Sequence, residues 1–549
     1  MKTAYTFIMK ALPVLLTALC WTSCSDFLEE DPKGQLPSDT YFSNKEDLDA
    51  SLTALYSVIA SSQASNNLCG TNFLVGDDIS THPSSNKQPL REHDQFDVKD
   101  NNSWLSSMWE QRFKVIKAAN FIINNAERTP EVSKDDIKVA IAQAHYWRAY
   151  SYFYLVTTWG RVPIMLKEEI DYNAPLKTEE EVYELILSDL KIAETDCPAL
   201  YTKEPYGRNG MNIAVSEGAV KATMAYVYMC MAGWPLNKGV EYYKLAAAKA
   251  KEVIDGADGG SYYYKLLPEY SQVYSWEYNN KNTELLLGIY YNRDATGQSA
   301  PLTDFLQDMK QAGWGDTNGE INFWMNFPEG PRKDAIYGSN NGKVYVEKYT
   351  YAGQFIDWYQ KDADGNYIMS ECHPMFRTLL YGGGKDGNTM GDYTDQQCTW
   401  NSGICSQTLY LVSYSEVLLW YAEAQTRSTN SVDALSKDCL QRVLDRSYGS
   451  GTYSAQDFAK NAEDFANKCW MEHGYEVAGY YPALVVRGND QLRMNDLKNT
   501  FANRLADTPV KVTEGVEIAE GVKMLGTWSE SRNYSTIPSF DSDLNDNLK

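Results

Sequence analysis

The residue with the clearest chemical role near the start of the chain is Cys24. It follows a short charged segment, an apolar run over residues 11–19 and the small residue Ser23. The apolar run is too short to span a bilayer, and a small residue directly before cysteine is typical of a lipoprotein signal. We therefore expect residues 1–23 to be removed and the Cys24 thiol to be acylated. The alternative is an ordinary cleaved signal and a secreted protein without a lipid.

Acidic side chains are the next candidates for chemistry, because a glycoside hydrolase needs two carboxylates that face each other across a cleft. Glu416 and Glu423 share one face of an expected helix, but they flank its core-facing stripe. With 73 acidic residues in the chain, such a pair arises easily by chance. None of the five histidines lies in an HExxH motif. We predict no catalytic residue and expect the protein not to be an enzyme.

Two further segments suggest a metal or a phosphate site. Residues 362–366 (Asp-Ala-Asp-Gly-Asn) are similar to the start of an EF-hand loop, but His373 stands where that loop requires glutamate. A hairpin turn is favoured there, with calcium as the alternative. Residues 381–386 lack the spacing of a P-loop and the Ser or Thr after its Lys. We therefore predict no metal site and no cofactor.

The charge of the chain limits its partners. The formal net charge is −23, and loss of two lysines with the signal makes it −25. Proteins that bind nucleic acid neutralise phosphates with Lys and Arg, so an acidic chain argues against such a partner. No second apolar run approaches the length of a membrane span, so we expect the mature protein to be anchored to a membrane without crossing it.

Eight cysteines remain besides Cys24 in the mature chain, and no two of them show CxxC spacing. Export permits disulfides, and Cys372, Cys398 and Cys405 are the candidates for one. Cys230 lies in an apolar run and is expected to be a small core residue.

Two blocks of helical periodicity form the expected scaffold, at about residues 44–255 and 409–446. Apolar residues recur at helical spacing in each segment, and consecutive segments are long enough to stack in pairs as in TPR proteins. The segments are 44–59, 103–126, 134–157, 179–194, 214–231, 242–254, 409–427 and 432–445. Small residues at 214, 218, 222 and 225 predict the close approach of another helix.

Two regions without helical periodicity stand apart from this scaffold. Residues 70–102 predict a long loop, and long loops in compact proteins often carry function. Residues 256–407 are rich in Gly, Asn, Asp, Tyr and Trp, with a strand-like run at 343–351 and a hairpin pattern at 357–367. We expect a mainly α fold of TPR-like stacked helix pairs. It carries a large irregular insertion with short β-hairpins and ends in a mixed C-terminal part.

Several motifs in this order resemble the SusD/RagB family of outer-membrane nutrient-binding lipoproteins. The resemblance rests on these segments, which span nearly the whole chain: Cys24-Ser25-Asp26-Phe27-Leu28 with Pro32, residues 41–56, residues 109–120, Trp147-Arg148-Ala149-Tyr150, Trp159-Gly160-Arg161-Val162-Pro163, residues 414–424, and Ile537-Pro538 with Leu544 and Leu548. Residues 472–481 match the family's charged helix segment only loosely.

The resemblance implies a division of the chain and a cellular role. Residues 1–23 would be the lipoprotein signal, 24–37 an acidic tether, and 38–549 one SusD-like domain with its ligand-binding part at about 256–407. The protein would be a surface-exposed, lipid-anchored protein of the outer membrane. It would capture oligosaccharides and deliver them to a SusC-like TonB-dependent transporter.

The residues that would bind the oligosaccharide must be argued from chemistry, because no family motif carries them. Sugar rings need flat apolar faces for their CH sides and polar groups for their hydroxyls. Trp314 is the sharpest candidate, since it lies in a glycine-flanked turn beside Asp316, Thr317 and Asn318. Further candidates, each with core packing or a solvated loop as its alternative, are Trp276, Trp324, Trp358, Trp400, Asp78 and His82.

Two other functions remain open at the level of sequence. One is a glycoside hydrolase on the cell surface, and the other is a peptide receptor of the RagB type. Net acidity favours a neutral glycan over a sulfated or uronate-rich one.

Overall fold

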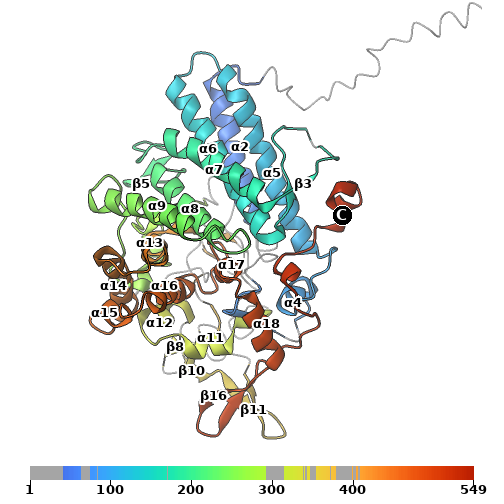
Figure 1. The fold of residues 1–549 in the computed structure, drawn as a ribbon, viewed down its shortest axis with the longest axis vertical. Helices are drawn as coiled ribbons and strands as arrows, with labels where there is room; N and C mark the ends of the chain where they lie inside the picture. Colours follow the sequence, from blue (N-terminus) through green and yellow to red (C-terminus); the bar gives the residue numbers. More distant parts are fainter. Residues whose placement is uncertain are drawn as a thin grey trace, which may run out of the picture.

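The computed structural model describes residues 41–63, 74–82, 85–169, 171–291, 315–337, 339–340, 343–346, 354–370, 373–376, 378, 398–399, 404–405 and 408–549. Cys24 and the predicted signal and tether lie outside these residues. Figure 1 shows an elongated molecule with long helices at one end and short strands at the other.

Helices of very different lengths form most of the described chain. Those of the first block are α2 (Lys45–Ser62), α4 (Gln88–Asp94), α5 (Ser103–Asn125), α6 (Lys134–Trp159), α7 (Glu179–Asp196), α8 (Glu217–Ala232) and α9 (Val240–Asp258). Those after it are α11 (Ile321–Asn326), α12 (Pro331–Tyr337), α13 (Tyr414–Thr429), α14 (Ala434–Tyr448), α15 (Ala455–Phe458), α16 (Ala462–Glu476), α17 (Arg487–Arg493), α18 (Leu497–Ala506) and α19 (Ser539–Ser542). Short 3-10 turns include η4 (Trp276–Tyr278) and η10 (Asp546–Leu548).

The helices begin and end where local chemistry predicts. Ser133 caps α6 by accepting a hydrogen bond from Asp136 N, and Gly160 follows its last residue with a φ of 68°. Thr178 and Glu181 form a reciprocal capping box at the start of α7. The predicted helices at 103–126, 134–157 and 179–194 are therefore confirmed to within a few residues.

Successive helices pack against each other in chain order, which confirms the TPR-like stacking. α6 lies against α5 and α7, α8 against α7 and α9, and α13 against α9, α14 and α16. α6 is the central helix, because every side chain from Ala142 to Trp159 is buried. Its rings form a ladder in which Trp147 meets Tyr146 and Tyr150 edge-on at 5.2 Å.

The small residue Gly218 of α8 does allow a close approach, but the group that approaches it is not a helix. Gly218 was expected to admit another helix, but its neighbour is an aromatic ring. A Cβ atom at Gly218 would lie 2.5 Å from the Tyr264 hydroxyl oxygen. Cys230 is buried in the same helix, as predicted, and its thiol is free.

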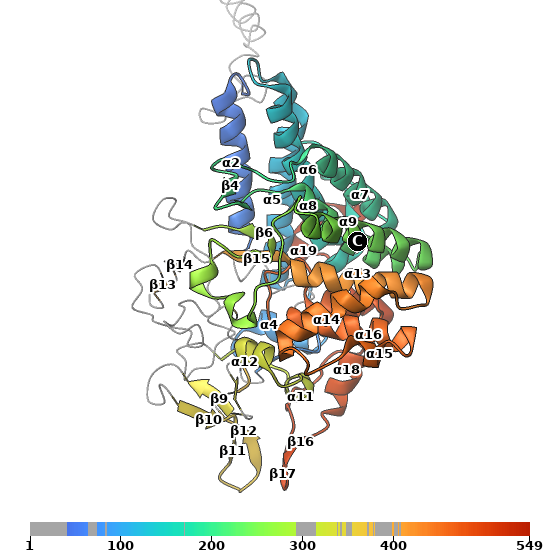
Figure 2. The ribbon, with the colours of Figure 1, turned by 90° about the vertical axis from the view of Figure 1, so that its left-hand side faces the viewer.

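The strands are short and pair into small antiparallel sheets. They are β1 (Ile79–Thr81), β2 (Val162–Pro163), β3 (Leu176–Lys177), β4 (Gly207–Arg208), β5 (Met211–Asn212), β6 (Leu285–Ile289), β7 (Thr317–Gly319), β8 (Ser339–Asn340), β9 (Lys343–Val346), β10 (Gln354–Asp357), β11 (Tyr359–Lys361), β12 (Tyr367–Met369), β13 (Cys398–Thr399), β14 (Ile404–Cys405), β15 (Leu409–Ser413), β16 (Val510–Thr513) and β17 (Val516–Ile518). In Figure 2 most helices lie along the top and the right, whereas β9–β12 lie at the lower left.

Two sequence-based boundaries are corrected. Residues 409–413 are not helical but form β15, which pairs with β6, and the helix starts at Tyr414. The run Leu-Tyr-Leu-Val-Ser is buried on both faces, a pattern that a strand and a helix can share. The predicted loop at 70–102 contains α4, which has a proline in its first turn.

The hairpin expected at 357–367 is confirmed as β11–β12. Cys398 and Cys405 are register partners in β13–β14, whereas Cys372 lies outside the described residues. Within the described part of the chain, no helix has the length and apolar character needed to cross a membrane.

Candidate functional site

The β1–β7 ribbon joins the two loops in which the sequence placed the main binding candidates. Ile79, Ser80 and Thr81 pair with Gly319, Asn318 and Thr317. Backbone hydrogen bonds extend the ribbon at both ends, from His82 N to Asp316 O (2.7 Å) and from Glu320 N to Asp78 O (3.0 Å). Segments about 235 positions apart thus meet, and the described chain resumes after Trp314 at Gly315, which has a φ of 64°.

Polar side chains gather at the His82 end of this ribbon. The half-buried His82 ring stacks on the ring of His373, with centroids 5.4 Å apart. Ser85 Oγ donates a 2.5 Å hydrogen bond to Asp316 Oδ1. These contacts fix the end of the ribbon next to the chain that leads to Trp314.

Burial keeps the two imidazoles neutral. It lowers the pKa of His82, and it lowers the pKa of His373 to about 3. A neutral imidazole has one donor and one acceptor, which suits hydroxyl groups. Burial also raises the pKa of Asp316.

Other predicted contacts are corrected, since Thr317, Asn318 and Asp316 are no more than 3% exposed. These three residues form part of the ribbon and its contacts, and their side chains do not face solvent. Asp78 is likewise buried, and its Oδ2 accepts a 2.9 Å hydrogen bond from Gly479 N. Burial raises the pKa of Asp78 to about 7. The Asp78 carboxyl thus holds the backbone at Gly479 and does not face solvent.

Two of the tryptophans that were candidates for ligand binding pack in the core, which was the alternative for each of them. Trp324 lies on α11 and Trp358 between β10 and β11, with exposures of 2% and 0%. Their rings meet edge-on at 5.2 Å, so neither ring offers a free face to a ligand. Trp314 and Trp400 lie outside the described residues, as does the side chain of Trp276 in η4.

A polar cavity of about 350 Å³ lies next to the ribbon and was not predicted. Ser80 Oγ donates to Glu520 (2.7 Å), which also accepts from Ile321 N (2.8 Å). Burial, and then the charge of Glu520, raise the pKa of Glu320 to about 8. The amides of Asn322, Asn326 and Asn503 line the cavity together with Phe323 and Tyr475. These groups come from elements that are far apart in the chain. No sequence motif links them, so the sequence contained no signal for this cavity.

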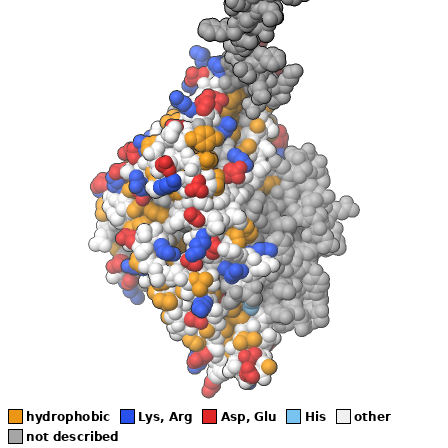
Figure 3. All heavy atoms as spheres, turned by 90° about the vertical axis from the view of Figure 1, so that its right-hand side faces the viewer, with side chains coloured by type: hydrophobic (Ala, Val, Ile, Leu, Met, Phe, Trp, Pro, Cys, Tyr) orange, Lys and Arg blue, Asp and Glu red, His pale blue; other side chains and the backbone are white. Residues whose placement is uncertain are grey.

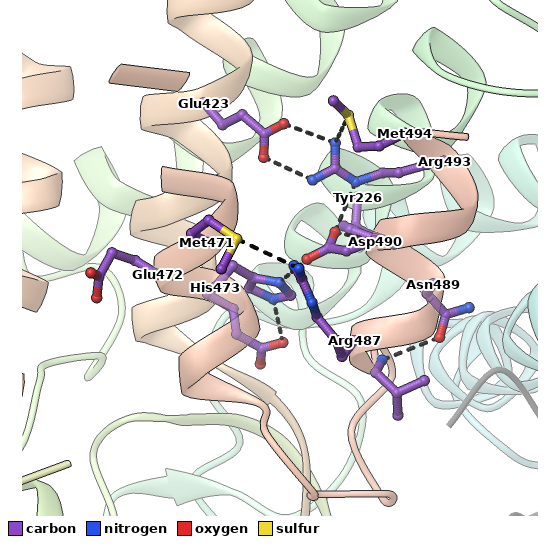
Figure 4. Close-up of polar contacts among 12 residues, drawn as sticks. Tyr226, Glu423, Met471, Glu472, His473, Arg487, Asn489, Asp490, Arg493 and Met494 are labelled. Carbon is purple, nitrogen blue, oxygen red and sulfur yellow. Dashed lines mark hydrogen bonds and ion pairs between the residues drawn. The ribbon is translucent and has the colours of Figure 1, made fainter. Parts of the chain in front are cut away.

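The carboxylates of the hydrolase alternative are buried in ion pairs (Figure 4). Glu423 Oε1 and Oε2 accept hydrogen bonds of 2.9 and 2.8 Å from Arg493. Glu416 Oε1 lies 3.2 Å from His473 Nε2. Glu416 and Glu423 are 4% and 1% exposed, so they do not face a cleft that could admit a glycosidic bond.

The turn that was weighed as a calcium loop uses its carboxylate internally. Asp362 Oδ1 accepts hydrogen bonds from Asp364 N (3.0 Å) and Asn366 N (2.8 Å). Such bonds lower the pKa of Asp362 and close the β11–β12 hairpin. Across the described ranges, no group of three or more His, Cys, Asp or Glu side chains is arranged to hold a metal ion.

Comparison with known proteins assigns the fold. A SusD-like protein of Bacteroides ovatus is 24% identical over 557 residues, covering 97% of this chain and 92% of that protein. A crystal structure with xylogluco-oligosaccharide superposes with a TM-score of 0.67 at 20% identity, covering 91% of this chain and 98% of that one. A SusD-like carbohydrate binding protein from Bacteroides fragilis gives a TM-score of 0.67 at 15% identity, covering 93% and 100% of the two chains.

The family model that matches is described as starch-binding and associating with the outer membrane, and it covers residues 26–229. That region contains α2 through most of α8, the helices that resemble the family in their motifs. Among the proteins with the same fold, one from Bacteroides fragilis is named a carbohydrate binding protein and one from Bacteroides uniformis a surface glycan-binding protein. The family-model match over residues 26–229, a relative along nearly the whole chain and the shared fold all bear out the similarity of this chain to SusD-like proteins.

Proposed function

We propose that this protein is a cell-surface glycan-binding lipoprotein that captures oligosaccharides and delivers them to a SusC-like TonB-dependent transporter. The observation that carries the proposal is the β1–β7 ribbon in a chain that is similar to SusD-like proteins along nearly its whole length. The ribbon joins residues 79–81 of the first long loop to residues 317–319, the described part of the second segment in which the sequence predicts ligand contacts. Relatives with this fold bind carbohydrate, one of them in a crystal structure with xylogluco-oligosaccharide.

The chemistry at the ribbon suits an uncharged saccharide. His82 and His373 are neutral near pH 7 because burial lowers the pKa of each ring. Neutral side chains do not require a charged ligand, and an indole next to them would cover the CH face of a sugar ring. The strong net negative charge of the chain disfavours sulfated or uronate-rich glycans over long range.

A glycan and peptide array separates this function from a peptide receptor. The mature chain, with Cys24→Ala for solubility, should bind a small set of neutral oligosaccharides and no peptides. Selective binding to peptides would contradict the proposal. Incubation of the bound glycan with the protein should release no reducing ends, because Glu416 and Glu423 are held in buried ion pairs.

The anchor is tested separately by cell fractionation. Cys24→Ala should move the protein from the membrane fraction to the soluble fraction, since the acylated thiol would be its attachment. If the variant stays in the membrane after a high-salt wash, the lipid is not the anchor.

Delivery requires a complex with the transporter. Gentle detergent extraction from the native membrane, followed by affinity capture of this chain, should recover a large TonB-dependent transporter in near-equal amount. Recovery of this chain alone would contradict the transporter part of the proposal. The glycan-binding part is tested independently by the array.

A further inference from the structure

A second cavity, of about 650 Å³, lies between α5 and the C-terminal segment and shares no lining residue with the first. α5 contributes Trp109, Phe113 and Ile116 to it, and the C-terminal segment contributes Phe540 and Leu544. A third wall is formed by residues 163–172. We refer to this cavity as the α5 groove. Its interior is mainly apolar.

Hydrogen bonds hold the walls of the α5 groove in place. Asn120 Nδ2 donates to Met165 O and to Lys167 O, both at 3.0 Å, and so ties the 163–172 wall to α5. Trp109 Nε1 donates to Asp541 Oδ2 at 2.5 Å and ties the C-terminal wall to the same helix. Because both ties come from side chains on α5, the groove is a built feature of the fold.

Apolar side chains of the groove are unusually exposed. Leu544 is 66% exposed, Tyr172 55% and Phe540 44%. Figure 3 shows the right-hand side of the molecule in Figure 1, the side on which α5 and the C-terminus lie. Hydrophobic side chains reach the surface there among charged ones. Apolar surface of this kind, gathered in one groove, usually marks a binding site for another chain segment.

We propose that residues 26–40 of the same chain occupy the α5 groove, with Phe27 and Leu28 as their apolar anchors. The described chain begins at Tyr41, and the rings of Tyr41 and Phe42 pack on Phe121 of α5 at 5.4 and 5.1 Å. The segment that precedes Tyr41 therefore joins the body at the helix that lines the groove.

The segment is long enough to reach any part of that groove. The stretch from residue 27 to residue 41 spans at most about 46 Å. α5, with 23 residues, is about 35 Å long. The match to the SusD-like family model begins at residue 26 of this chain, so the matched range includes this segment.

Docking would change the expected tether. Residues 24–37 are predicted to be an acidic tether, but docking at Phe27 would leave only Ser25 and Asp26 between the acylated cysteine and the folded body. The body would then lie close to the membrane surface. The docking itself depends neither on glycan binding nor on the lipid.

Proteolysis of the full mature chain with Cys24→Ala tests the docking. Trypsin cleaves after Lys33, and docking should slow that cleavage. Leu544→Asp places a charge in the groove and should speed cleavage at least tenfold. Leu505→Asp is the matched control, since Leu505 on α18 is 61% exposed and lies outside the groove, and it should leave the rate unchanged. Equal rates in the Leu544→Asp variant and in the parent chain would overturn the proposal.

A photo-crosslink identifies the occupant directly. Benzoylphenylalanine at position 27 should crosslink within the same chain, to peptides from α5, residues 163–172 or residues 539–549. A crosslink to a second copy, to another protein or to lipid would show a different partner for Phe27 and overturn the proposal.

Discussion

Several charged side chains of this protein are buried, and each of them lies against a partner of opposite charge. Arg493 on α17 bonds to Glu423 on α13 and to Asp490, and His473 on α16 bonds to Asp490 and Glu416. All five side chains are at most 5% exposed. Ion pairs in such places add little net stability, but loss of one partner leaves a buried charge without compensation. The network therefore makes the seam between α13, α16 and α17 specific.

Glu423→Gln should lower the free energy of unfolding by about 3–5 kcal/mol, because Arg493 and Arg427 lose their shared counter-charge. Asp255→Asn is the control, since Asp255 pairs with Lys251 on the exposed face of α9 and its loss should cost less than about 1 kcal/mol. Urea unfolding measures both. Similar costs for the two variants would contradict the role assigned to the buried network.

His473 should make stability depend on pH. Burial opposes its charge, but Asp490 and Glu416 outweigh burial and raise the pKa of His473 to about 9. The folded pKa lies above the ordinary value of 6.5, so the stabilisation is complete below pH 6.5 and disappears as pH rises to about 9. Urea unfolding at pH 6 and pH 9 should show this loss, on the order of 3 kcal/mol. His473→Gln should be less stable at pH 6 and should lack this part of the slope.

At the scale of elements, periodicity and caps predicted the long helices well because local residues determine both. Ser133, Thr178 and Gly160 mark helix ends by chemistry that acts within one turn. The strands were harder, since β15 and β1 are defined by partners about 120 and 240 residues away. The same reason hid the cavity near Glu320 and Glu520. Composition singled out both the first long loop and the segment around residues 314–318, but it could not show that residues 79–81 pair with residues 317–319.

The β1–β7 ribbon should position the glycan site. A Cβ atom at Gly319 would lie 2.7 Å from the Tyr337 ring, so Gly319→Val should disturb the ribbon and cost about 1–3 kcal/mol of stability. It should also weaken glycan binding at least tenfold. Gly515→Ala, in the β16–β17 turn where φ is 76° and a Cβ atom meets no other atom, should cost about 1 kcal/mol and leave binding intact. Calorimetric titration distinguishes the two variants, and normal binding by Gly319→Val would place the site elsewhere.

At the scale of the whole molecule, the fold separates support from recognition. The stacked helices from α5 to α9 and α13 to α16 bury the aromatic and charged core, whereas the β1–β7 ribbon presents loops from distant parts of the chain. This division explains why the helical motifs resemble a family and the binding residues do not. A rigid scaffold can keep its core while its loops change with the ligand.

The most direct test of this account is calorimetric titration of Trp314→Ala with the oligosaccharide that the array identifies. Loss of a stacking indole should weaken binding about thirtyfold, or about 2 kcal/mol, by analogy with aromatic hot spots. Tyr453→Ala removes a ring that is 36% exposed between α14 and α15 and should bind as the parent chain does. Trp314→Ala should bind about thirtyfold more weakly than the parent chain, with a nearly unchanged melting temperature. Unchanged affinity would contradict a glycan site at Trp314, and so would weaker binding that comes with a large loss of stability.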